Sequence, residues 1–130
     1  KEPYATKEEF NRRVLRYRDV PLIELAPGSR SHIVSAERIT VSFVTAEPNI
    51  YFAPHRHEPE QIVIVTDGSC DTILEGKLYH LEAGDVLIVP SNIEHGNYIS
   101  DRGLRMIEVF SPPRRDLVAK LEAAKKSLKT

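Results

Sequence analysis

Two histidines one residue apart, His55 and His57, are the residues whose types and spacing most clearly suggest chemistry. Side chains on a strand alternate between two faces, so residues two apart point the same way. Neutral imidazole is the commonest metal ligand in proteins. The pair is therefore expected to offer two nitrogen atoms to one ion. Because five histidines occur in 130 residues, such a pair can arise by chance and is a weak motif on its own. The prediction of a metal site therefore depends on the residues around the pair.

Two further residues are candidate ligands of the same ion. Gln61 follows His57 by four residues and opens a predicted strand; if it faces inward, Val63 and Val65 face inward too. His95 follows a later strand and a turn, so three histidines and one amide oxygen would converge. The alternative is that His95 is a surface loop residue and Gln61 an exposed strand opener. The donors suit Zn, Ni, Fe, Mn or Cu and do not select one divalent transition metal.

The elements that must position these residues are mostly strands. Between residues 22 and 111, short β-rich runs alternate with turn residues at intervals of roughly 8–12 residues, which is typical of an all-β sandwich or barrel. Asp67-Gly68, between two apolar runs, indicates a hairpin. The predicted strands are residues 22–25, 31–35, 38–45, 51–57, 61–66, 69–74, 77–81, 85–89, 96–99 and 104–110.

A short helix is predicted before the strands. Residues 6–9 form a capping box that opens it. Phe10, Val14 and Tyr17 then recur at helical spacing, and the run 19–21, with its proline, ends the helix.

A second helix is predicted after the strands, at about residues 115–128. One apolar stripe runs along it, formed by Leu117, Leu121, Ala124 and Leu128. The stripe needs a surface to cover, which the barrel itself or a twin subunit would supply. Two terminal helices with apolar stripes, together with bare edge strands, predict a homodimer.

Composition limits the possible functions. With 41% hydrophobic and 28% charged residues and a net charge of -1, the chain is expected to be one soluble domain (residues 1–130, barrel core about 22–111) without affinity for nucleic acid or anionic membranes. No apolar run approaches 18 residues, so no membrane-spanning helix is expected. The lone Cys70, expected in a core or interface, and the absence of an apolar leader segment fit a cytoplasmic protein. His32 and His80 lack comparable partners and are interpreted as surface strand residues.

The spacing of these residues resembles that of the cupin family. Its first motif is matched by His55, His57 and Gly68, and its second by Gly84, Pro90 and His95. Four positions depart from the pattern: Asn49, Gln61, Asn92 and Ile99. The resemblance covers about residues 30–114. It implies an all-β cupin fold, a double-stranded β-helix or jelly-roll barrel with short N-terminal and C-terminal helices, and metal ligation by His55, His57, Gln61 and His95.

Gln61 stands where the cupin pattern has a metal-binding Glu. A neutral amide leaves the full charge on a bound dication, which favours an anionic small-molecule substrate. A base must then come from elsewhere. Glu108 is the candidate, because strand alternation places it on one face with Met106 and Phe110. The alternative is that Glu108 faces solvent or pairs with an arginine.

The ending of the last strand resembles a narrower group, the small cupins that ketonise unsaturated uronates in pectin and alginate breakdown. By this resemblance, Glu108 would transfer a proton, Phe110 would pack on the sugar and Arg114 would clamp a carboxylate. Glu108 stands where that group has Asp. The chain is thus expected to be a metal-dependent enzyme that opens the ring of a sugar acid or tautomerises it. The alternatives are a metal-dependent dioxygenase of a diketone, enol or phenol, and a non-catalytic sugar- or metal-binding protein.

Overall fold

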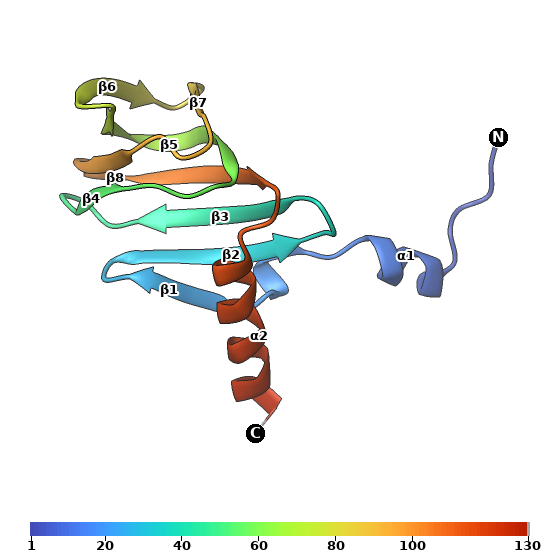
Figure 1. Ribbon diagram of the computed structural model, residues 1–130. Helices are drawn as coiled ribbons and strands as arrows, with labels where there is room; N and C mark the ends of the chain where they lie inside the picture. Colours follow the sequence, from blue (N-terminus) through green and yellow to red (C-terminus); the bar gives the residue numbers. More distant parts are fainter. Residues whose placement is uncertain (130) are drawn as a thin grey trace.

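The computed structural model describes residues 1–129, which form antiparallel strands in two layers with a helix at each end of the chain (Figure 1). In chain order the elements are α1 (Lys7–Arg13), the 3-10 helix η1 (Tyr17–Asp19), β1 (Leu22–Ala26), β2 (Ser29–Ser35), β3 (Thr40–Ala46), β4 (Tyr51–His55), β5 (Glu60–Leu74), β6 (Lys77–Glu82), β7 (Val86–Val89), β8 (His95–Ser111) and α2 (Arg115–Lys129).

Strands β5 and β8 are long enough to belong to both layers. In the first layer, β1, β2 and β3 lead to the end of β8, which pairs with the start of β5, and β5 in turn pairs with β7. In the second layer, the start of β8 lies between β4 and the end of β5, and β6 pairs with β5. This arrangement confirms the predicted all-β barrel with a short helix on either side.

The point where β5 changes layers was predicted to be a hairpin, and that prediction was wrong. Asp67 and Gly68 lie inside β5, so residues 61–66 and 69–74 are one strand; residues 96–99 and 104–110 are likewise one strand, which leaves eight strands instead of ten. Gly68 has φ 76° and faces Gly103, whose φ is 75°. A Cβ atom on Gly68 would overlap the Gly103 carbonyl oxygen, so a close approach of the two backbones, not a turn, explains this glycine.

The main core lies between the layers. Strand alternation points the apolar residues of both layers toward each other, so that water is excluded from their side chains. Val63 and Val65 are buried there, as expected, and so is Cys70 from the second layer. The buried residues of this core are Val44, Ala46, Val63, Val65, Cys70, Leu81, Ile99, Leu104 and Met106.

Helix α2 covers β1 and β2 of its own chain (Figure 1). Leu117 and Leu121 of its stripe pack in one buried cluster with Ile23, Ile33 and Phe110. The barrel therefore supplies the cover that the stripe requires. Leu128, at the far end of the stripe, is 75% exposed.

Helix α1 is shorter than predicted and leads away from the barrel (Figure 1). The capping box is present, with Thr6 Oγ1 accepting from the Glu9 backbone N–H and Glu9 accepting from the Thr6 N–H. The helix ends at Arg13, because Val14 is extended with φ -121°, and Tyr17 belongs to η1. No residue of α1 is buried. Among the described residues, no helix is long and apolar enough to cross a membrane.

The close approach at Gly68 predicts a specific loss of stability. Gly68→Ala should lower the free energy of unfolding by about 3 kcal/mol, because it adds an overlap with the Gly103 carbonyl to the cost of a left-handed backbone. Gly76→Ala is the matched control: its φ is 78°, but a new Cβ would have no neighbour within 4 Å. It should cost about 1–2 kcal/mol. Equal losses in urea unfolding would contradict the close-approach explanation.

Candidate metal centre

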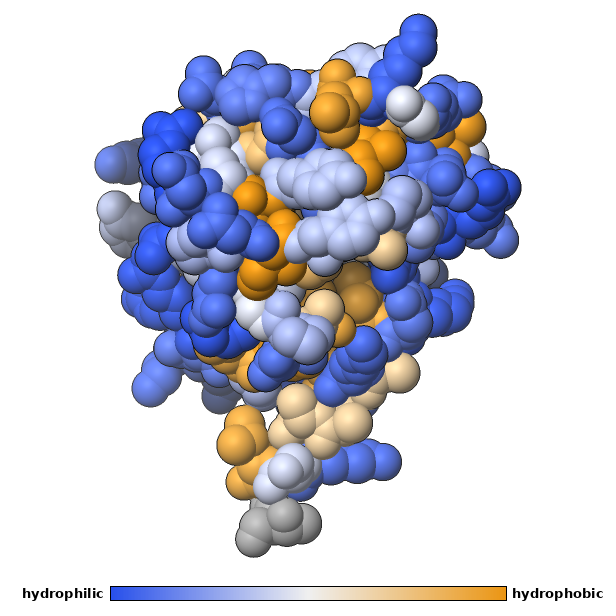
Figure 2. Space-filling model, turned by 90° about the vertical axis from the view of Figure 1, so that its left-hand side faces the viewer, coloured by the Kyte–Doolittle hydropathy of each residue, from blue (hydrophilic) through white to orange (hydrophobic). Residues whose placement is uncertain are grey.

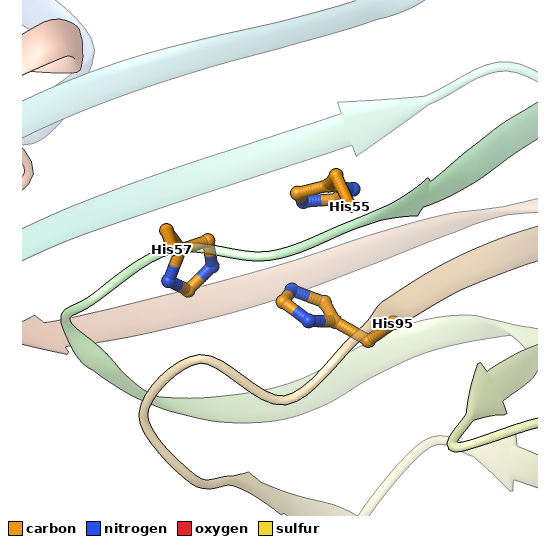
Figure 3. A group of neighbouring side chains, drawn as sticks. All are labelled: His55, His57 and His95. Carbon is orange, nitrogen blue, oxygen red and sulfur yellow. The ribbon is translucent and has the colours of Figure 1, made fainter.

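Three imidazole rings converge at one mouth of the barrel (Figure 3). His55 is the last residue of β4 and pairs with His95, the first residue of β8. His57 lies two residues beyond the end of β4, so the expectation that both histidines sit on one strand was wrong, although their rings still meet. One ring nitrogen from each of the three side chains lies within 4.8 Å of the others.

Each of these rings is oriented by its own backbone. The Nδ1 atom contacts a carbonyl oxygen two residues away in all three cases: His55 with Ala53 at 3.2 Å, His57 with Pro59 at 2.9 Å and His95 with Ile93 at 2.8 Å. A carbonyl can only accept, so Nδ1 carries the proton. Nε2 is then left with its lone pair, which is the arrangement that metal-binding histidines need.

Gln61 adds an oxygen to this cluster. It is buried as the second residue of β5, and its Nε2 donates to Glu108 Oε2 at 2.6 Å. Its Oε1 therefore faces His57 Nε2, at 3.1 Å. With the His57 proton on Nδ1, both of these atoms are acceptors, and a cation bound by both would relieve their repulsion. The residues present thus fit a divalent ion held by three imidazoles and one amide oxygen.

Burial keeps two of the imidazoles, those of His57 and His95, neutral. It lowers the pKa of His95 to about 4, with the neighbouring His55, His57 and Arg114 acting in the same direction. Burial also lowers the pKa of His57, again helped by Arg114. At neutral pH both rings therefore have a free lone pair.

Glu108 lies on the inner face of β8, half-buried beside Gln61. This is the face that strand alternation predicted. Burial raises its pKa to about 7, while Arg114 and the hydrogen bond from Gln61 oppose the rise. No arginine forms an ion pair with it among residues 1–129.

Arg114 is held by Asp116. Its Nε and Nη2 donate to the two carboxylate oxygens at 2.9 Å and 2.8 Å, and this pairing lowers the pKa of Asp116. The Arg114 side chain is only 16% exposed, and its guanidinium carbon lies 4.8 Å from the centre of the Phe110 ring. The edge formed by Nε and Nη2 is occupied, so a bidentate clamp on substrate would have to use Nη1 and Nη2.

Phe110 lies beneath the site and is not at its surface. It is 1% exposed, with Arg114 over its face and the His57 ring 5.6 Å away. It therefore cannot offer its face to a sugar, which corrects the substrate-packing role expected from the sequence. Its contacts support Arg114 and His57 instead.

Two adjoining cavities open beside the imidazoles. A small one of about 50 Å³ contains Gln61 and His95, and a wider one of about 420 Å³ is bounded by α2. Figure 2 shows one side of the molecule, where apolar residues gather in the centre of a mainly hydrophilic surface. The residues that line both cavities are His55, Asn97, Met106, Glu108 and Arg114.

Sequence reasoning missed two of the residues at these cavities. Asn97 accepts from Thr72 Oγ1 at 2.6 Å, and strand alternation from His95 could have placed it on the inner face. Asp116 contacts Arg114 only two residues away in the chain, so the signal that could have found it is an acidic residue next to that arginine at the start of the predicted C-terminal helix.

The remaining histidines lie outside the cluster. His80 is exposed and contacts Asp71 at 2.8 Å, as a surface residue would. His32 is half-buried, because its Nδ1 donates to the Val20 carbonyl and Tyr17 packs against its ring.

Fold and site together define a small jelly-roll barrel with an imidazole cluster at one mouth. Residues 42–110 match the family described as Cupin domain, and the chain belongs to that family.

Individual relatives agree with this assignment. The pectin degradation protein KdgF of Dickeya dadantii is 28% identical over 102 residues, which is 77% of this chain and 93% of the relative. The structure of KdgF from Halomonas sp. superposes with a TM-score of 0.71 and 27% identity over the same shares of the two chains. An RmlC-like cupin of Shewanella frigidimarina has a TM-score of 0.70 over 90% of this chain and 96% of its own; at 20% identity it supports the fold alone.

The convergence of donors predicts that metal content depends on each imidazole. His57→Ala should lose most of the bound metal, because a divalent site with few ligands depends on every donor. His80→Ala, which removes a histidine outside the cluster, should bind as much metal as the wild type. Elemental analysis after dialysis against each candidate metal measures both. Full occupancy of His57→Ala would contradict the assigned site.

Proposed function

We propose that this protein is a metal-dependent enzyme that acts on an unsaturated uronate, opening its ring or tautomerising it. The observation that carries the proposal is the placement of Glu108 and Arg114 on the same cavities as the imidazole cluster. The similarity to two KdgF proteins, one described as a pectin degradation protein, supports a sugar-acid substrate.

The metal would be held by His55, His57, Gln61 and His95, and would supply Lewis-acid polarisation of a substrate oxygen. All four ligands are neutral, so the site as a whole would remain cationic. A substrate with a carboxylate is favoured by this charge and by Arg114, which lies close enough to lower the pKa of His57 and His95.

Glu108 is proposed to move the proton that the isomerisation requires. Its carboxylate lines both cavities, and Gln61 fixes one of its oxygens at 2.6 Å. The other oxygen, Oε1, accepts no hydrogen bond from residues 1–129, so it is available to a substrate proton.

Arg114 is proposed to orient the substrate carboxylate through Nη1 and Nη2. The adjacent edge of the guanidinium, formed by Nε and Nη2, is fixed by Asp116, and the guanidinium face is fixed by Phe110. Such a guanidinium has lost most of its rotamer freedom before substrate arrives, which lowers the entropic cost of binding.

The assay that tests the function follows the loss of absorbance of a 4,5-unsaturated uronate. Metal-free protein should be inactive, and one of Zn, Ni, Fe, Mn or Cu should restore turnover. The rate should be the same with and without oxygen. An unchanged substrate would refute the proposal, and oxygen consumption with an enol or phenol would favour the dioxygenase alternative. Saturable binding without turnover would favour a non-catalytic protein.

Replacement of Glu108 predicts a loss in turnover. Glu108→Gln keeps the shape and can still accept from Gln61 through its amide oxygen, but it cannot take a proton. Turnover should fall by about 10²–10⁴ with the Michaelis constant nearly unchanged. Glu122→Gln on the exposed surface of α2 is the control and should behave as wild type. A turnover within a factor of about two of wild type for Glu108→Gln would exclude the proton-transfer role.

Replacement of Arg114 and Asp116 predicts effects on binding. Arg114→Ala should raise the Michaelis constant roughly tenfold to a hundredfold, the cost of a lost charge-assisted hydrogen bond. Asp116→Asn should raise it by a smaller factor, because Arg114 remains but loses one charged anchor. Arg115→Ala, an exposed neighbour, is the matched control. Unchanged Michaelis constants in both site variants would show that the substrate carboxylate binds elsewhere.

A further inference from the structure

The outer face of the first layer is unusually apolar for a barrel surface. Ile62 pairs with Ile88 and Val109, and the next outward row joins Ile64 to Val86 and Ile107. Ile62, Val86 and Ile88 are 39%, 58% and 61% exposed. In most antiparallel sheets one face is buried and the other polar, but here both are apolar. We call these two rows the outer ladders; they consist of Ile62, Ile64, Val86, Ile88, Ile107 and Val109.

The N-terminal arm, residues 1–16, has apolar side chains that contact no core. Phe10, Val14 and Leu15 are 48%, 46% and 56% exposed, and α1 has no buried residue. A helix of seven residues is not stable alone in water. Helix α1 is therefore expected to be stable only when another surface covers its apolar side chains. The arm leaves the barrel at η1, where Tyr17 stacks on Phe43 at 4.1 Å. Phe43 pairs with Ile107, so the arm starts at the edge of the outer ladders.

The two surfaces also complement each other in charge. The N-terminal arm, residues 1–16, contains five basic and three acidic side chains. Arg12, Arg13 and Arg16 have no ion pair among the described residues. Two exposed acidic residues lie at the ends of the outer ladders: Glu60, two residues before Ile62, and Asp85, next to Val86. Neither of them forms an ion pair among the described residues.

The exposed area is larger than one compact chain should have. A monomer of 14.7 kDa is expected to expose about 6,900 Å². This chain exposes 8892 Å², an excess of about 2,000 Å². A standard interface takes about 800 Å² from each partner, so the excess is ample for a stable dimer.

We propose that the N-terminal arm packs on the outer ladders of a second copy of this chain. In a twofold dimer each subunit gives one arm to its partner and receives one in return. A single type of contact, repeated by the symmetry axis, therefore covers the arm and the outer ladders of both subunits. Phe10, Val14 and Leu15 cover the ladder side chains, and the arm arginines face Glu60 and Asp85. This interface is independent of the proposed function, because it lies on the side of the sheet opposite the imidazole cluster.

Sedimentation equilibrium of the full chain tests the proposal. The wild type should be a dimer of twice 14.7 kDa. Phe10→Asp in the arm and Ile88→Lys in the ladders should each weaken the dimer at least tenfold, as loss of an interface anchor does. Leu78→Lys, at a position 63% exposed on β6 and outside the ladders, is the control and should leave the dimer intact. Circular dichroism and metal content verify that each variant is folded.

A mixing experiment identifies the occupant of the ladders. The Phe10→Asp variant has intact ladders and the Ile88→Lys variant has an intact arm, so an equimolar mixture can form one unaltered junction. The mixture should dimerise more tightly than either variant alone. A monomeric wild type would overturn the proposal. So would a Phe10→Asp dimer as tight as wild type, which would mean that the sheets pack directly on each other.

Discussion

The close backbone contact between Gly68 and Gly103 is the constraint on which the rest of this barrel depends. It allows β5 and β8 to remain paired while both strands pass from one layer to the other. Gln61 lies near one end of β5, and His95 and Glu108 lie toward opposite ends of β8. Because the strands bend together, residues distant along each strand line one cavity. A side chain on Gly68 would overlap the Gly103 backbone, so the two strands could not stay this close at the point where they change layers.

Within the site, Gln61 connects the metal ligands with the acid-base chemistry. Its amide oxygen faces His57 while its amide nitrogen holds Glu108. A glutamate in this position would set a second carboxylate against Glu108, and two ionised carboxylates repel each other and have no hydrogen to share. A neutral amide can satisfy both neighbours at once, and buried polar networks of this kind are stable only when each member has a partner. The amide thus determines both the charge at the ligands and the orientation of the carboxylate.

Much of this arrangement follows from local rules that a sequence expresses. Alternation placed Gln61, Val63 and Val65 on the inner face, and the capping box placed the start of α1. The hairpin at Asp67-Gly68 was wrong because Asp-Gly has the same local preference in a turn and in a bulge, and only the Gly103 backbone, 35 residues away in the chain, distinguishes them. The burial of Phe110 was missed for a similar reason: it depends on α2, whose position no local pattern specifies.

Helix α2 has two roles that become inseparable in energetic terms. Its residues Leu117 and Leu121 seat it on β1 and β2, while Asp116 at its start anchors Arg114. Seating of the helix and placement of the guanidinium are therefore one equilibrium, and thermodynamic linkage makes the coupling reciprocal. An anion held by Arg114 must tighten the helix against the barrel, and a partner that pulled the helix away would release the anion. Amide hydrogen exchange along α2 thus reports on the occupancy of a cavity that the helix only borders.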